Sequence, residues 1–252
     1  MTRTKRSWGS DRTAADAAYA AAFDRLFVQG RDAVLSGTHY RDTPPVDGGR
    51  WGMSVVFIPD PDSVSRLAAV TAEVLGFAGP GHWPTGAPEA VHFTVRAVED
   101  HRRDVPAGDP LAARCAAALG RAATECRPVR FRLAGMTLTP SGVMVCAFPI
   151  DGAADEFADR LGAELGSDGW FEDSYHRDIW YATLVHFTDE VRDGQGLVDW
   201  VARRRKLQLG EATIDRADLL RFQHNGRQPV RVGLDHARLG AASVAAPISD
   251  HR

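Results

Sequence analysis

The tetrapeptide Val91-His92-Phe93-Thr94 returns 94 positions later as Val185-His186-Phe187-Thr188. Each copy lies in an apolar stretch rich in β-branched residues, 90–98 and 179–188, and such stretches are typical of β-strands. In each half of the chain, the order is strand, helix, strand, helix, strand, with the tetrapeptide in the second strand. The sequence therefore predicts an internal repeat whose two histidines face each other across a pseudo-twofold axis.

Hydrophobic periodicity and turn residues around the two copies predict the other elements. Helices are expected over 13–36, 62–77, 110–126, 153–165 and 197–206, and further strands over 51–59, 128–138, 143–150, 212–223 and 230–235. The first helix has an apolar stripe, so it should pack on the rest of the chain. The stripe consists of Tyr19, Phe23, Leu26, Phe27 and Val34.

These elements predict a domain organisation. Residues 1–50 are expected to form an N-terminal helical extension and loop, and residues 239–252 a tail. Between them, residues 51–238 should form one bilobal domain, with one lobe over about 51–140 and the other over about 141–238.

Composition excludes several classes of protein. With 44% hydrophobic and 25% charged residues, the chain is not a disordered one. A net charge of -3 argues against a nucleic-acid coat protein, although it permits a local cationic cleft. No apolar run reaches the roughly 20 residues of a membrane helix, and Asp11 and Asp16 interrupt any signal-peptide core. The three cysteines have neither an even count nor a metal spacing, so a cytoplasmic protein is expected.

The repeated tetrapeptide carries the chemistry. Side chains alternate along a strand, so His92 and Thr94 should share one face, about 6.6 Å apart, as should His186 and Thr188. An imidazole and a hydroxyl at that separation can both reach one small anion, and a second pair encloses it. Two groups that titrate near neutrality, with two hydroxyl donors, supply what metal-free cleavage of a phosphodiester requires.

At these residues the sequence resembles the 2H phosphoesterase superfamily, which includes bacterial 2'-5' RNA ligase-like proteins and cyclic nucleotide phosphodiesterases. Its motif is His-x-Thr/Ser-x, with apolar x, on the central strands of two pseudo-symmetric lobes. The resemblance covers roughly residues 51–238 and implies an α+β fold, with antiparallel-rich sheets around a central cleft and helices outside. It implies that His92 and His186 are the acid/base pair and that Thr94 and Thr188 bind phosphate. Asp189 departs from the apolar last position of the motif.

The resemblance also implies a reaction: hydrolysis of a 2',3'-cyclic or 2'-5' phosphodiester in RNA or a nucleotide. No cofactor, no membrane and no obligatory protein partner is expected, and the partner is a nucleotide or an RNA end. One alternative is a nucleotide- or RNA-binding module that keeps the cleft without turnover. Another is the same cleft recruited to a different small-molecule reaction. The histidines could also merely satisfy hydrogen bonds in their strands, whereas neither has a partner at zinc spacing.

Several further residues are weaker candidates for substrate contacts. Arg96 shares the strand parity of His92, and Arg130 and Arg132 alternate with apolar residues, so each could meet a phosphate or lie in solvent. Trp83 lies in the loop before the first motif strand, where it could stack on a base or pack as a lid. Trp170, Phe171 and Tyr175 occupy the corresponding segment of the second half.

Overall fold

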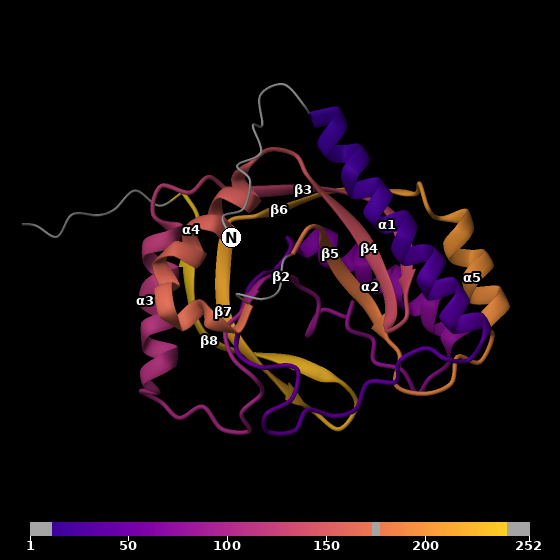
Figure 1. Cartoon of the computed structure of the whole chain (residues 1–252), viewed down its shortest axis with the longest axis horizontal. Coiled ribbons are helices and arrows are strands. Elements are labelled where there is room, and N and C mark those ends of the chain that lie inside the picture. Colours follow the sequence, from indigo (N-terminus) through magenta and orange to yellow (C-terminus); the bar gives the residue numbers. More distant parts are fainter. Residues whose placement is uncertain (1–11, 173–176, 241–252) are drawn as a thin grey trace, which may run out of the picture.

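Two four-stranded sheets with helices on their outer sides form the protein (Figure 1). The computed structural model describes residues 12–172 and 177–240, with side chains from residue 15 onward. The helices are α1 (Arg12–Leu35), α2 (Pro61–Ala78), α3 (Pro110–Ala123), α4 (Ala153–Leu165), the 3₁₀ helix η1 (Gly166–Glu172) and α5 (Gly194–Arg203). The fold is α+β, as the sequence predicts.

The two sheets have matching strand orders. In the first sheet the order is β2-β1-β7-β8, and its strands are β1 (Ser54–Phe57), β2 (Phe93–Ala97), β7 (Arg216–His224) and β8 (Pro229–Arg238). In the second sheet the order is β5-β4-β3-β6, and its strands are β3 (Val129–Thr139), β4 (Gly142–Pro149), β5 (Trp180–His186) and β6 (Gln208–Ile214). All pairs are antiparallel, and β2 and β5 are the equivalent end strands.

A division of the chain at residue 140 does not separate these sheets. β3 forms a hairpin with β4 through the two-residue turn Pro140-Ser141, and its other edge pairs with β6. β7 and β8 return to the first sheet, where β7 pairs with β1. The strand expected over 212–223 is therefore two strands in different sheets, separated at Asp215. Periodicity shows where strands lie, but their distant partners are chosen by tertiary packing.

The N-terminal helix α1 is part of the core. Tyr19, Phe23 and Val34 are buried, as the apolar stripe predicts. The hydroxyl of Thr137 in β3 donates a hydrogen bond to the carbonyl of Phe23 (2.9 Å). Gly30 lies so close to β3 that a Cβ there would be 2.5 Å from the carbonyl carbon of Leu138. The helix therefore packs directly on the second sheet.

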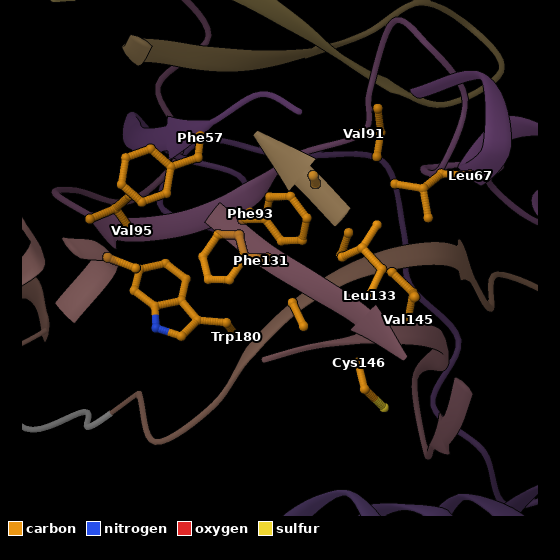
Figure 2. Packing of buried hydrophobic residues seen from close by; sticks show 14 of the residues in the cluster. Phe57, Leu67, Val91, Phe93, Val95, Phe131, Leu133, Val145, Cys146 and Trp180 are labelled. Carbon is orange, nitrogen blue, oxygen red and sulfur yellow. The ribbon is translucent and has the colours of Figure 1, made fainter. Parts of the chain in front are cut away.

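Aromatic side chains from both sheets form one core (Figure 2). The Phe93 and Phe131 ring centroids are 4.9 Å apart, and those of Phe131 and Trp180 are 5.3 Å apart. Phe57 and Trp180 stack at 5.8 Å. Because this cluster joins β1 and β2 to β3 and β5, it fixes one sheet relative to the other. It also anchors Phe93, so that His92 and Thr94 point away from the core.

The remaining expectations about the chain concern its cysteines, its end and membranes. Cys115, Cys126 and Cys146 are buried and unpaired, as their number and spacing predict. Leu239, at the start of the expected tail, is buried, and residues 241–252 lie outside the described part. Within the described ranges, no helix combines the length and apolarity needed to cross a membrane.

Candidate active site

A pocket of about 240 Å³ is lined by both sheets and contains both motif histidines. β2 contributes Thr94 and Ala97, and β5 contributes Tyr181, Thr183 and His186. The loop before β1 and the segment after η1 add two cations, Arg50 and Arg177. The pocket therefore gathers imidazoles, hydroxyls and guanidinium groups that can bind a small anion. Two carboxylates, Glu99 and Asp100, also line it, and Glu99 is paired with Arg102 (2.8 Å).

His92 has one defined neutral form. Its Nδ1 lies 2.7 Å from the carbonyl of Ala90, which can only accept, so Nδ1 carries the proton. Nε2 has no hydrogen-bond partner among the described residues, and the ring packs 5.0 Å from Phe222. Burial lowers the pKa of His92 to about 4, and the charges of Arg231 and Arg177 add to this effect. At neutral pH, Nε2 therefore presents a lone pair.

His186 is held at the end of β5 by two backbone hydrogen bonds to Trp83 (3.0 and 3.1 Å). Its Nδ1 shares a 2.8 Å hydrogen bond with the hydroxyl of Thr85, which can donate or accept. Burial lowers the pKa of His186 to about 3, with further contributions from the charges of Arg50 and His92. Both imidazoles are therefore neutral at pH 7, and a positive charge on His92 would further disfavour protonation of His186.

The two arginines that line the pocket are each held by a carboxylate. Arg50 pairs with the buried Asp42 at 3.1 Å. Arg177 pairs with Glu172, whose carboxylate also accepts the backbone N–H of Ala97 in β2 (3.0 Å). These ion pairs orient the guanidinium groups, so that they supply positive charge beside the histidines.

The loop before β1 is strained where it meets the pocket. Trp51 has φ 73°, in the left-handed region that non-glycine residues seldom adopt. Its ring contacts those of His186 (4.8 Å) and Phe222 (5.2 Å) edge-on. The next residue, Gly52, lies against Glu99, whose carbonyl oxygen would be 1.9 Å from a Cβ. Such strain is concentrated at functional sites, and here it places an aromatic wall beside His186.

The structure separates the two predicted threonines. Thr94 lines the pocket, and its hydroxyl has no partner among the described residues. Thr188 does not line the pocket: its hydroxyl donates to the carbonyl of Gly81 (2.6 Å), and its backbone N–H donates to Nδ1 of His82 (3.1 Å). Because β5 ends at His186, strand alternation does not extend to Thr188. The predicted contact of Thr188 with phosphate beside His186 is therefore not supported by this geometry.

Two residues that the sequence analysis missed, Tyr181 and Thr183, line the pocket instead. They alternate with Trp180 and Ala182, which are buried in the core, so they share the exposed face of β5. Neither hydroxyl has a hydrogen-bond partner within the described ranges. The sequence signal was present in Trp180-Tyr181-Ala182-Thr183-Leu184, but the exact tetrapeptide repeat further on hid it.

Solved structures resemble this fold, although neither a family model nor a curated protein matches the sequence. TT0787 of Thermus thermophilus has 17% sequence identity and a TM-score of 0.56, over 75% of this chain and 98% of that one. E. coli LigT complexed with 3'-AMP has 11% identity and a TM-score of 0.55, over 76% and 99%. A structure described as a phosphoesterase has 13% identity and a TM-score of 0.51, over 75% and 98%. The chain shares the fold of these structures.

The three arginines that the sequence analysis singled out have structural contacts, and it did not predict Arg50 or Arg177. The Arg96 guanidinium donates to the carbonyl of Gly169 in η1, away from the pocket. Arg130 lies 3.7 Å from Asp151, and Arg132 pairs with Asp16 of α1 at 2.8 Å. None of the three lines the pocket, so their expected contact with substrate is not supported by the geometry.

Of the aromatic candidates that the structure describes, only Phe171 lines the pocket. Trp83 is buried and pairs with the backbone of His186, so it supports the histidine rather than offering a face to a base. Phe171 lines the pocket, whereas Trp170 is 60% exposed outside it. Tyr175 lies outside the described residues. Among the residues that are described, no group of three or more His, Cys, Asp or Glu side chains could hold a metal ion.

Proposed function

We propose that the protein is a metal-independent phosphodiesterase that acts on a 2',3'-cyclic or 2'-5' phosphodiester of RNA or a nucleotide. One observation carries this proposal: two neutral imidazoles share one pocket with the hydroxyl of Thr94 and two arginines. An acid/base pair beside anion-binding groups is what in-line attack at phosphorus requires.

His92 acts as the base in this reaction. Its proton is fixed on Nδ1 by the carbonyl of Ala90, so Nε2 can accept the proton of the attacking water or ribose hydroxyl. His186 acts as the acid, because the Thr85 hydroxyl accommodates a protonated Nδ1 while Nε2–H gives its proton to the leaving oxygen. The negative charge of a bound phosphate raises the pKa of an adjacent imidazole, so substrate binding favours the protonated His186.

The phosphate and the nucleobase of the substrate have separate partners in the pocket. The Thr94 hydroxyl donates to a non-bridging oxygen, and Arg50 and Arg177 offset the charge that develops in the transition state. Trp51 and Phe171 offer aromatic faces on which a base can stack. A nucleotide substrate is consistent with the crystal structure of E. coli LigT, a protein of the same fold, in complex with 3'-AMP.

Nucleoside 2',3'-cyclic phosphates and 2'-5' dinucleotides, assayed in the presence of EDTA, test the proposal. Turnover should persist in EDTA and should be lost in His92→Ala. As a control, His92→Ala should melt at the same temperature as the wild type, which shows that the variant is folded. Tight binding of these compounds without turnover would overturn the enzyme assignment and would favour the nucleotide-binding module.

A further inference from the structure

The two end strands beside the pocket share one irregularity. In β2, Thr94 pairs with Val56 and Arg96 with Val55, which leaves Val95 without a partner. In β5, Thr183 pairs with Met144 and Val185 with Val143, which leaves Leu184 without a partner. Each bulge lies in the end strand of its sheet, where β2 pairs with β1 and β5 pairs with β4. The bulge therefore provides a common reference point for aligning the two halves of the chain.

This register aligns Thr94 with Thr183 and His92 with Tyr181. The intervening Phe93 and Ala182 are both fully buried, and the bulged residues Val95 and Leu184 are buried as well. Tyr181-Ala182-Thr183-Leu184 therefore repeats the pattern of His92-Phe93-Thr94-Val95, with apolar residues at the second and fourth positions. His186, five residues after Tyr181, aligns with Ala97.

We propose that Tyr181 and Thr183 form the second half of the phosphate site, with the phenol of Tyr181 in the place that symmetry gives to an imidazole. This inference rests on the proposed function and deepens it. A phenol hydroxyl is a hydrogen-bond donor, so Tyr181 donates to a phosphate oxygen and takes no part in the proton transfer. Proton transfer remains with His92 and His186, and Thr94, Thr183 and Tyr181 hold the phosphate.

Binding of inorganic phosphate and 3'-AMP, measured by isothermal titration, tests this assignment without requiring turnover. Thr183→Val and Tyr181→Phe should each weaken binding on the order of tenfold, because each removes a donor to a charged ligand. Thr188→Val is the matched control and should bind as the wild type does, since its hydroxyl is engaged by Gly81.

The reverse result, a loss in Thr188→Val and none in Thr183→Val or Tyr181→Phe, would overturn the assignment, as would a wild-type protein that binds neither ligand. If Thr183→Val and Tyr181→Phe weaken binding as expected but the protein cleaves no phosphodiester, only the proposed function is contradicted. Thermal melting of each variant identifies any loss that reflects unfolding.

A second, larger pocket adjoins the first. It has a volume of about 430 Å³, and it shares Arg177 and Tyr181 with the histidine pocket. Its other walls come from α1, which contributes Arg25, Leu26 and Gln29, and from the turn between β3 and β4. A ligand that passes Tyr181 would therefore leave the histidines and reach the N-terminal helix.

Arg25 makes this second pocket suitable for an anion. The other arginines in contact with α1 are paired: Arg31 with Asp32, Arg132 with Asp16 and Arg205 with Asp24. Arg25 has no carboxylate partner among the described residues, and it lies beside the apolar side chains of Leu26 and Ile179. We infer that this pocket takes the second nucleoside of an oligonucleotide substrate, with a terminal phosphate on Arg25.

Comparison of a short and a long ligand tests this subsite. The long ligand is a 2'-5' dinucleotide with a terminal phosphate, in which a methylene group replaces the leaving oxygen of the internal linkage, so that neither water nor a ribose hydroxyl can displace it. Arg25→Ala should weaken its binding about fivefold to tenfold and leave 3'-AMP unaffected, since a charge-assisted hydrogen bond is lost only in the long ligand. Arg31→Ala, on the same helix, is the control. Equal effects on both ligands, or no effect on either, would overturn the subsite, whether or not the protein cleaves such compounds.

Discussion

Thr94 and Thr183 each immediately precede the one bulged residue of their strand, and both line the same pocket. A bulge reverses the alternation of side chains beyond it. In β2 this turns Arg96 away from the pocket toward η1, where it meets the carbonyl of Gly169. In β5 the same reversal turns His186 into the pocket, although it lies five positions, an odd number, after Tyr181. The same irregularity in the two strands therefore explains why Arg96 departs from its predicted face and why His186 lines the same pocket as Tyr181 and Thr183.

Loss of either imidazole should remove most of the catalytic rate. His92→Ala and His186→Ala are each expected to lower kcat on the order of 10² to 10⁴, because proton transfer by a positioned side chain contributes that much. The double variant should be little worse than the worse single one, since the two groups act in one step. Steady-state kinetics on purified variants with unchanged circular dichroism measure this, and a His92→Ala protein of full activity would contradict it.

Removal of the Thr94 donor should affect the chemical step more than binding of the ground state. Thr94→Val keeps the side-chain shape, and its hydroxyl has no protein partner to lose among the described residues. If the hydrogen bond strengthens as charge develops on phosphate, kcat should fall by a larger factor than KM rises. Equal kcat with a raised KM would show that Thr94 serves binding alone.

Stability should decrease as the pH falls below about 6.5, the ordinary pKa of histidine. Burial lowers the pKa of His92 to about 4 in the folded state, so between these pH values the unfolded chain binds more protons. The folded state then loses up to about 2 kcal/mol per histidine between pH 6.5 and 5. Urea unfolding at pH 7 and pH 5 measures the loss, which should be smaller in His92→Gln. An identical loss in that variant would show that His92 titrates normally.

Arg231 is expected to position His92. Its guanidinium donates to the carbonyls of Val91 (2.7 Å) and Glu89 (3.3 Å), and thereby fixes the segment that leads into β2. Arg231→Met should cost about 1–3 kcal/mol of stability and lower kcat. It should also shift the limb of the pH–activity profile that reflects His92 to higher pH, because the charge of Arg231 lowers the pKa of His92. The exposed Arg227→Met is the control, and an unmoved pH profile would leave Arg231 with a purely structural role.

Two helical glycines should respond to alanine in opposite directions. In Gly30→Ala, the new methyl would meet the backbone of Leu138 at 2.5 Å, so α1 must move from β3 at a cost of roughly 1–3 kcal/mol. At Gly76, in α2, nothing lies within 4 Å, so Gly76→Ala should stabilise the fold by about 0.5–1 kcal/mol. Thermal melting of both variants tests whether α1 is an integral part of the domain, and a stabilised Gly30→Ala would refute the close packing.

The sequence by itself determined most of the elements, because their periodicity is local: the amphipathic α1 and the strand that carries His92 and Thr94 follow from hydrophobic periodicity and turn residues. The α+β class followed from the resemblance of the two motifs to those of the 2H phosphoesterases. Phe93 in the core and Thr94 in the pocket confirm the alternation in β2. Only the tertiary structure decided which strands pair, since β3 joins β4 and β6 while β7 crosses back to β1. It also decided that Tyr181 and Thr183 line the pocket while the hydroxyl of Thr188 bonds to Gly81. A single bulged residue changes the face of every side chain beyond it, and its position is set by the register of the neighbouring strand, which the periodicity of one strand does not contain.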